Sequence, residues 1–389
     1  MIYFDNAATT AVSPAVRDAM LPYFTEIFGN PSSIFYSIGS DARRSMEEAR
    51  KTVADCLGCD AKEIYFTASG SEADNWAIKG AALKSGKKHI ITSAIEHHAV
   101  IHTCEFLEKQ GYSVTYLPVD KNGLVSPADL ENAITEDTAL VSIMYANNEI
   151  GTIQPIRELA EIAHKKGVLF HTDAVQAVGT VPIDLSSLGV DMLSLSAHKF
   201  HGPKGIGALY IKKGTKIERL IHGGGQERGM RAGTENTAYI VGLAKALSDA
   251  TENMEAKTEK VKHLRDKLIR GVLDAVPYTI LNGHETLRLP GNANFSFRFI
   301  EGEGLLLHLA LSGFAVSSGS ACASASLDPS HVLLAIGLPH EIAHGSLRVS
   351  LSAENTEEEV DAFLKTLPGI VENLRQMSPL YEEIQNGKE

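Results

Sequence analysis

The stretch that decides the fold is SLSAHKFHGPKGIG, residues 194–207, which begins inside the apolar run 190–195. The apolar run predicts a buried strand, and Ser196, His198 and Lys199 follow at the end of that strand. Ligands of open α/β sheets bind at the carboxyl ends of the strands. A lysine at such a place, beside hydroxyl and imidazole groups, suits a Schiff-base lysine. Taken alone, the stretch also fits a basic surface turn.

Strand-like and helix-like segments alternate on both sides of this stretch. Short strands are predicted at 63–68, 89–92, 114–117, 140–145, 168–171, 192–196 and 207–211. Such alternation with intervening helices predicts an α/β fold with a mostly parallel, helix-covered sheet. Near the start, Ser13 and Pro14 form an N-cap and a first helical residue, so a helix is predicted from there to about residue 28.

The last third of the chain changes in character. A long helix is predicted from about residue 237 through 274, with an interruption near residue 251. An alternating strand at 294–300, a further strand at 346–351 and a final helix from residue 356 follow it. These changes predict two domains, which are a large one at 14–255 and a smaller α+β one made of 1–13 and 256–389.

Composition excludes several classes of protein. The 389 residues carry a net charge of -12, which argues against a surface that binds nucleic acid. No apolar run approaches the length of a membrane span, and the first residues lack the basic start of a signal peptide. Four cysteines are few for this length, so we expect a reducing, cytoplasmic location.

Polar residues follow four of the predicted strands. They are Ser71, Asn148, Asp173 and the group around Lys199. Because parallel strands end at the same edge of a sheet, we expect these side chains to converge. A glycine–serine turn before a helix, here Gly70 and Ser71, offers backbone N–H groups to a phosphate.

A phosphate site, a carboxylate and a lysine are the groups that pyridoxal phosphate requires. Lys199 is the candidate for the Schiff base, and Asp173 for the carboxylate that keeps the pyridine nitrogen protonated. Gln176, three residues after Asp173, is placed to hydrogen-bond the ring oxygen. Asp173 as the N-cap of a helix is the alternative to this assignment.

With these groups in place, the chain resembles the cysteine desulfurases of the NifS/IscS type, in the class V group of fold type I pyridoxal-phosphate enzymes. The resemblance spans nearly the whole chain and rests, in order, on YFDNAATT, FTASGSEADN, the Glu96–His97 pair, NNEIG, HTDAVQAVG, SAHKFHGPKGIGALY, HGGGQERGMRAGTEN and SSGSACASAS. It implies a fold type I transferase, with the large domain and the smaller α+β domain described above.

The resemblance also implies a role for each matching residue. Lys199 carries the cofactor, and His97 stacks on the pyridine ring and handles protons. The cofactor's other contacts come from Gly70, Ser71, Asn148, Asp173, Gln176, Ser196 and His198. Thr234 reaches the phosphate of a neighbouring subunit, which implies a homodimer. Asn148 and Arg348 hold the substrate, with Arg348 on its α-carboxylate, which a guanidinium fork suits.

Cys322 resembles the catalytic cysteine of the family. Its neighbours are almost all Ser, Ala and Gly, so little apolar burial holds this segment in one shape. A cysteine that receives sulfur at the cofactor and then presents it elsewhere needs such mobility. A buried structural cysteine in a small-residue turn is the alternative.

The activity implied is removal of sulfur from L-cysteine to give L-alanine and a persulfide on Cys322. The persulfide passes to an acceptor protein, either an iron–sulfur scaffold or a tRNA-thiolation protein. A selenocysteine lyase or aminotransferase on the same fold, and a non-catalytic partner protein, remain alternatives.

No metal site is expected. Cys56 and Cys59 have C-x-x-C spacing but no second pair of ligands, so we interpret them as incidental, with a redox pair as the alternative. His98 and His102 lack the glutamate of a zinc-protease motif and are interpreted as surface or packing residues.

Overall fold

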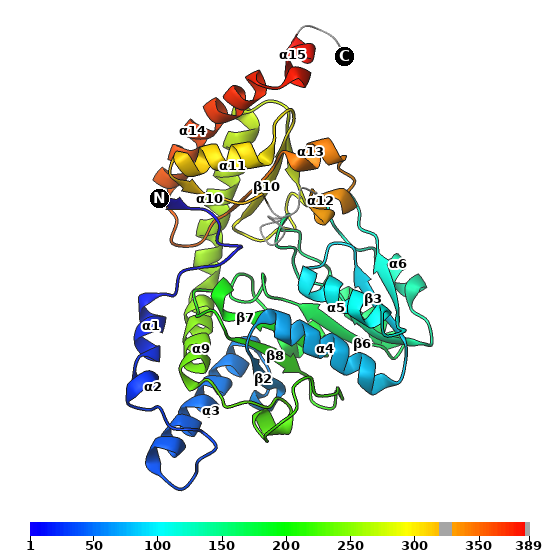
Figure 1. The fold of residues 1–389 in the computed structure, drawn as a ribbon, viewed down its shortest axis with the longest axis vertical. Helices are drawn as coiled ribbons and strands as arrows, with labels where there is room; N and C mark the ends of the chain where they lie inside the picture. The colour runs from blue at the N-terminus through cyan, green and yellow to red at the C-terminus, as the bar shows by residue number, and fades with distance from the viewer. Residues whose placement is uncertain (319–328, 386–389) are drawn as a thin grey trace.

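The computed structural model describes residues 1–318 and 329–385 of the chain. These residues form an elongated molecule with two lobes, in which the lower lobe of Figure 1 is built on a seven-stranded sheet. The upper lobe holds a three-stranded sheet and a two-stranded one. None of the described helices has the length and apolar character that crossing a bilayer requires.

The seven-stranded sheet sets the position of the site. Its order is β2 (Ile64–Thr67), β8 (Gly207–Ile211), β7 (Met192–Ser196), β6 (Leu169–Asp173), β5 (Thr138–Ser142), β3 (His89–Ser93) and β4 (Ser113–Leu117). Only β8 runs antiparallel to its neighbours β2 and β7, so the other six strands point the same way. The prediction of a mostly parallel sheet is confirmed, and the carboxyl ends of those six strands share one edge.

Helices cover both faces of this sheet. The first face packs against α4 (Gly70–Ser85) and α5 (His98–Glu108). The second face packs against α3 (Ser37–Leu57), α6 (Pro127–Ala133), α7 (Ile156–Lys165), α8 (Leu185–Leu188) and α9 (Thr237–Thr251). Successive strand residues serve opposite faces, since Ile90 and Leu140 belong to the first core while Ile91 and Val141 belong to the second. Both cores are closed to water, as a parallel sheet requires.

The predicted helix from residue 14 to about 28 is wrong in its extent. The structure has two short helices instead, α1 (Pro14–Met20) and α2 (Pro22–Thr25). Ser13 caps α1 as expected, with its Oγ accepting from Val16 N at 3.2 Å. Pro22 has no N–H to continue the first helix and starts the second one.

A long helical path joins the two lobes. The predicted interruption near residue 251 is confirmed, because α9 ends at Thr251 and α10 (Met254–Ala275) begins after Asn253 in a left-handed conformation. Figure 1 shows α10 rising from the lower lobe along the upper one.

The upper lobe is an antiparallel sheet covered by helices. Its strands are β9 (Thr279–Asn282), β10 (Asn292–Phe297) and β12 (Ser346–Ser350), beside the pair β1 (Ile2–Tyr3) and β11 (Phe314–Ala315). Its helices are α10, α11 (Gly302–Leu311), α12 (His331–Ala335), α13 (His340–His344), α14 (Glu357–Gln376) and α15 (Pro379–Gln385).

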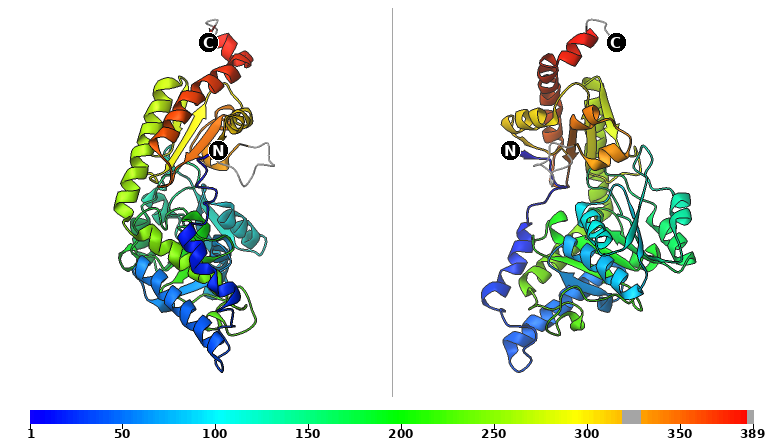
Figure 2. Two further views of the ribbon diagram at one scale, coloured as in Figure 1. Left: turned by 90° about the vertical axis from the view of Figure 1, so that its left-hand side faces the viewer. Right: turned by 45° about the vertical axis from the view of Figure 1, so that its right-hand side comes forward.

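The N-terminal segment belongs to both lobes. Phe4 is fully buried in the upper core, where its ring meets Phe314 and Phe363. The segment then runs down to α1 on the lower lobe (Figure 2). It therefore crosses the junction between the lobes, where the candidate site lies. The domain division at residue 255 stays a prediction.

Candidate active site

A cavity of about 580 Å³ lies at the carboxyl edge of the large sheet, against the N-terminal segment. The predicted site residues that line it are Gly70, Ser71, His97, Asn148, Asp173, Gln176, Ser196, His198, Lys199 and Arg348. Among the predicted residues that the structure describes, only Thr234 lies elsewhere. The convergence expected from the strand ends is therefore present in the fold.

Lys199 ends the short 3₁₀ turn Ala197–Lys199 that follows β7. Its Nζ donates to the carbonyl oxygens of Ala7 at 2.6 Å and Ala8 at 2.9 Å. The N-terminal segment thus holds the lysine at the cavity wall. Sequence reasoning missed this contact because backbone carbonyls carry no residue-type pattern.

Asp173 is the last residue of β6 and is almost fully buried. Burial raises its pKa to about 6, and the positive charge of Lys199 acts in the opposite direction. Its Oδ1 accepts from Val175 N at 2.9 Å, which is a local turn and not the cap of a helix. A buried carboxylate of this kind is suited to face a cationic group, because a cation offsets the cost of its burial.

Gln176 anchors the N-terminal segment from the opposite side. Its Nε2 donates to the Ala7 oxygen at 2.9 Å, the same oxygen that accepts from Lys199. Gln176 and Lys199 therefore both donate to the same carbonyl oxygen, that of Ala7.

The start of α4 supplies an anion-binding turn. Ser69 caps the helix, with its Oγ accepting from Glu72 N at 3.1 Å. Within residues 1–318 and 329–385, no group accepts from the N–H of Gly70 or Ser71. A Cβ on Gly70 would come within 2.6 Å of a Val175 methyl group, so only glycine fits there. Free N–H groups at the positive end of a helix fit a phosphate.

His198 borders the same turn as a neutral imidazole. Burial, with the nearby charges of Lys199 and Lys204, lowers its pKa to about 4. Its Nδ1 lies 3.1 Å from Thr9 Oγ1. The fully buried β7 residue Ser196 lies beside it at the cavity wall. Lys204, the hydroxyls of Ser71 and Ser196 and the start of α4 line the same cavity, and they are a donor set that suits a phosphate, as pyridoxal phosphate requires.

His97 is held by the helix that follows it. It is the N-cap of α5, and its Nδ1 accepts from Ala99 N at 3.1 Å, so the proton of the neutral ring is on Nε2. Burial first, and then the charge of Lys199, lower its pKa to about 4. Near neutral pH this imidazole is uncharged and can donate from Nε2.

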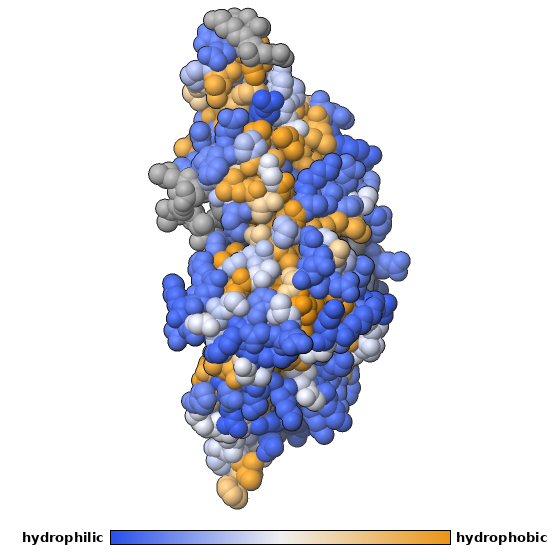
Figure 3. All heavy atoms as spheres, turned by 90° about the vertical axis from the view of Figure 1, so that its right-hand side faces the viewer, coloured by the Kyte–Doolittle hydropathy of each residue, from blue (hydrophilic) through white to orange (hydrophobic). Residues whose placement is uncertain are grey.

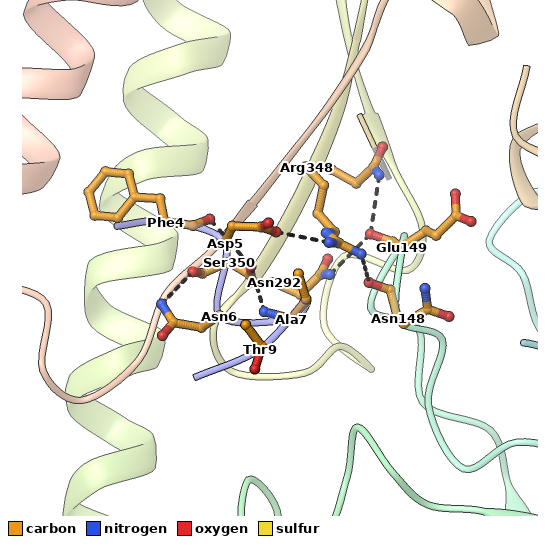
Figure 4. Close-up of polar contacts among 12 residues, drawn as sticks. Phe4, Asp5, Asn6, Ala7, Thr9, Asn148, Glu149, Asn292, Arg348 and Ser350 are labelled. Carbon is orange, nitrogen blue, oxygen red and sulfur yellow. Dashed lines mark hydrogen bonds and ion pairs between the residues drawn. The ribbon is translucent and has the colours of Figure 1, made fainter. Parts of the chain in front are cut away.

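Arg348 reaches the cavity from β12 in the upper lobe and is 2 % exposed. Its Nη1 donates to the backbone oxygen of Asn148 at 3.0 Å, and its Nη2 lies 2.9 Å from Asp5 Oδ1 (Figure 4). The guanidinium is therefore gripped on two sides by segments from different lobes. Sequence reasoning found Arg348 but not Asp5, although Asp5 lies in the quoted YFDNAATT motif.

Glu96 is a second residue that sequence reasoning did not assign. It is fully buried, and its Oε1 accepts from Ser93 Oγ at 2.6 Å and from Met144 N at 2.9 Å. Burial raises its pKa to about 8. The signal in the sequence that could have identified Glu96 was its position next to His97, between a predicted strand and a predicted helix.

Thr234 does not line the cavity. Thr234 is exposed on a loop that Arg231 ties to Glu72 at 2.8 and 3.0 Å. Cys322 lies outside the described residues. The described positions on either side of residues 319–328 adjoin the cavity, since Ser317 pairs through its backbone with Arg348 and Ser330 Oγ donates to Glu149 at 2.5 Å.

The proposed chemistry does not use the remaining cysteines, which are Cys56, Cys59 and Cys104, or the histidines His98 and His102. Burial raises the pKa of Cys56, and raises those of Cys59 and Cys104 to about 12. His98 packs against His102 with ring centres 5.0 Å apart, as expected, but it also lines the cavity. No group of three or more His, Cys, Asp or Glu in the described ranges is arranged to hold a metal ion.

The chain is similar to known proteins in sequence and in fold. The Aminotransferase class-V family profile matches residues 2–363. The chain is similar to the cysteine desulfurase IscS of Clostridium botulinum, with 59% identity over all of this chain and 98% of that protein. It is similar to the cysteine desulfurase IscS of Methanosarcina thermophila, with 60% identity over 97% of this chain and 94% of that one. A solved NifS-like protein superposes with a TM-score of 0.90, at 44% identity over 96% of this chain and all of the other.

Proposed function

The chain belongs to the class-V aminotransferase family as a cysteine desulfurase that depends on pyridoxal phosphate, and on that premise we propose that Cys322 receives the sulfur of L-cysteine as a persulfide. The observation that supports the site assignment is one cavity that joins Lys199, Asp173 and the start of α4 to Arg348 from the other lobe.

The cavity residues fit the cofactor. Lys199 would bind its aldehyde carbon, Asp173 would hold a proton on its ring nitrogen, and the start of α4 would take its phosphate. When bound, pyridoxal phosphate supplies an electron sink that stabilises negative charge on the substrate Cα. The buried carboxylate of Asp173 would keep that sink protonated.

The chain's own residues account for the remaining steps. Arg348 takes the substrate α-carboxylate, since a guanidinium fork matches a carboxylate. Lys199 Nζ, as a free amine, would accept the proton from Cα. His97 holds a proton on Nε2 near neutral pH and can deliver it on the substrate side.

Cys322 acts as the nucleophile toward sulfur. Its thiolate attacks the sulfur of the substrate, an S–S bond forms, and the C–S bond breaks with its electron pair moving to carbon. That carbon gains a proton and leaves as the methyl group of L-alanine, while the substrate sulfur is oxidised to the persulfide level. The thiolate is the reactive form of cysteine, and the raised pKa values of Cys56, Cys59 and Cys104 keep those three as thiols.

The persulfide is proposed to pass to an acceptor protein, which is an iron–sulfur scaffold or a tRNA-thiolation protein.

Figure 3 shows one face of the molecule, mostly hydrophilic, with apolar atoms at its lower tip. Large apolar side chains are exposed on the segment from α2 to the start of α3, namely Phe24, Phe28, Ile34, Phe35 and Tyr36. An exposed apolar patch of this kind supports the proposal of a homodimer. A cytoplasmic location stays a prediction.

The test is turnover of L-cysteine by the purified holoenzyme, with alanine and sulfide both measured. We expect equal amounts of the two products in the presence of a thiol reductant. Cys322→Ser should abolish both while leaving the visible absorbance of the bound cofactor unchanged, whereas Lys199→Ala should alter the absorbance as well. Full alanine release by Cys322→Ser would overturn the persulfide step, and would favour another reaction on the same fold.

A further inference from the structure

One partner of Arg348 within the chain is a carboxylate. Asp5 Oδ1 lies 2.9 Å from Arg348 Nη2, and the side chains are 19% and 2% exposed. Figure 4 shows Asp5 on one side of the guanidinium and the Asn148 carbonyl on the other. The Arg348 guanidinium, which is proposed to bind the substrate carboxylate, therefore already forms an ion pair with Asp5.

The position of Asp5 does not depend on its own side chain. Asn6 Nδ2 donates to Ser350 O at 2.9 Å, and Ala7 N donates to Ser350 Oγ at 2.9 Å. Phe4, just before it, is buried in the upper core. Because neighbouring residues anchor the segment, a change of the Asp5 carboxylate alters charge at Arg348 without releasing the backbone.

The charges around Arg348 limit what can bind. Asp5 offsets the single positive charge of the guanidinium before any substrate arrives. Asp173 and Glu149 also line the cavity. Burial raises the pKa of Glu149, and the nearby positive charge of Arg348 acts in the opposite direction. One further carboxylate can share the guanidinium, but a second one close to Arg348 would lie against the negative charge of Asp5.

We propose that Asp5 is a specificity-determining residue, which orients Arg348 and restricts the cavity to amino acids with a single carboxylate. This rests on the proposed role of Arg348 in binding the α-carboxylate. Acidic amino acids, which carry a second carboxylate, are excluded by the charge of Asp5.

Asp5→Asn tests this, because an amide keeps an oxygen that accepts from Nη2 but lacks the charge. Binding of L-alanine and of L-aspartate to the holoenzyme is measured by titration calorimetry. We expect the variant to bind L-aspartate at least about tenfold more tightly relative to L-alanine than the native protein does. Asp41→Asn, which removes one charge from an exposed ion pair with Arg44, should leave the ratio unchanged.

An unchanged or lower ratio in Asp5→Asn would overturn the proposal. If that variant unfolds, which thermal melting shows, Asp5→Ser supplies a second neutral side chain and must shift the ratio in the same direction. Arg348→Gln separates this inference from the proposed function. If Arg348→Gln leaves the affinity for L-alanine intact, the role of Arg348 fails; if it weakens that affinity while Asp5→Asn changes nothing, only the inference about Asp5 fails.

Discussion

At the scale of single residues, Glu96 and His97 are neighbours in the chain that burial drives toward the same neutral state. Burial raises the pKa of the Glu96 carboxyl to about 8 and lowers that of the His97 imidazole to about 4. Both directions follow because removal from water disfavours the charged form of either group. Near neutral pH, Glu96 and His97 are therefore uncharged. They do not weaken the electrostatic attraction between the side chains of Lys199 and Asp173.

Glu96→Gln tests the buried neutral carboxyl. The folded chain keeps the Glu96 proton up to about pH 8, whereas the unfolded chain releases it near its ordinary pKa of 4.5. The contribution of Glu96 to the free energy of unfolding is therefore largest below pH 4.5. It falls as the pH rises from 4.5 to about 8, by up to about 1.4 kcal/mol per pH unit. Glutamine does not titrate. We expect the melting temperature of the variant, relative to the native protein, to rise from pH 5 to pH 8.

The same titration series carries its own control. Glu161→Gln, a change at an exposed carboxyl of α7, is the matched control. A constant difference in melting temperature between Glu96→Gln and the native protein from pH 5 to pH 8 would mean that Glu96 is ionised in the folded protein.

At the scale of elements, α3 carries a buried ion pair that holds the loop bearing Thr234. Arg50 and Glu227 are 2% and 3% exposed, and their two contacts measure 2.8 Å each. Glu227 also accepts from Phe66 N on β2 at 3.0 Å. The pair thus ties a glycine-rich loop to the edge strand of the large sheet.

Arg50→Ala should destabilise the fold by about 3–5 kcal/mol, because it leaves the Glu227 charge buried without its partner. Arg44→Ala on the same helix is the matched control. It breaks an exposed pair with Asp41, 2.6 Å apart, and should cost about 0–1 kcal/mol. Denaturant unfolding of both variants measures the difference. Equal losses would show that burial does not set the strength of the Arg50–Glu227 pair.

Elements were predictable where a local pattern exists. The strands that place Asp173 and Lys199 show apolar runs, and the break between α9 and α10 lies where the helical pattern was interrupted. The antiparallel direction of β8 and the early end of α1 were not found. Strand direction depends on pairing across the sheet, which no local pattern encodes. Pro22, which has no N–H to continue α1, was a local signal that the helical prediction for residues 14–28 did not take into account.

At the scale of the whole molecule, the N-terminal segment is the link between the lobes at the site. Asp5 contacts Arg348 from the upper lobe, while the carbonyls of Ala7 and Ala8 receive Lys199 from the lower one. Ser71, Asn148, Asp173 and Lys199 were predictable because they follow strands, whereas His97 and Arg348 were assigned through the resemblance to the family. Asp5 was not assigned because its partner is 343 positions away and no spacing rule connects them.

Exchange of subunits tests the proposed homodimer and the role of Thr234 together. Lys199→Ala lacks the reactive amine, and Thr234→Glu should block phosphate binding in the opposite subunit because it places a negative charge beside the phosphate. If each site uses Thr234 from the partner, a mixed dimer has one site with both residues intact. Mixing two inactive variants after dissociation should therefore restore about a quarter of native turnover, given random pairing and equal subunits. No recovery, with dimers present by analytical ultracentrifugation, would place Thr234 at the site of its own chain or outside the site.

The central claim is that sulfur leaves L-cysteine for Cys322. Mass spectrometry of peptides after a single addition of L-cysteine to the holoenzyme, without reductant, tests it most directly. We predict one extra sulfur atom on the peptide that contains Cys322, in proportion to the alanine released, and none in Cys322→Ser. Alanine release with the sulfur on Cys56, Cys59 or Cys104, or with no bound sulfur at all, would contradict the account.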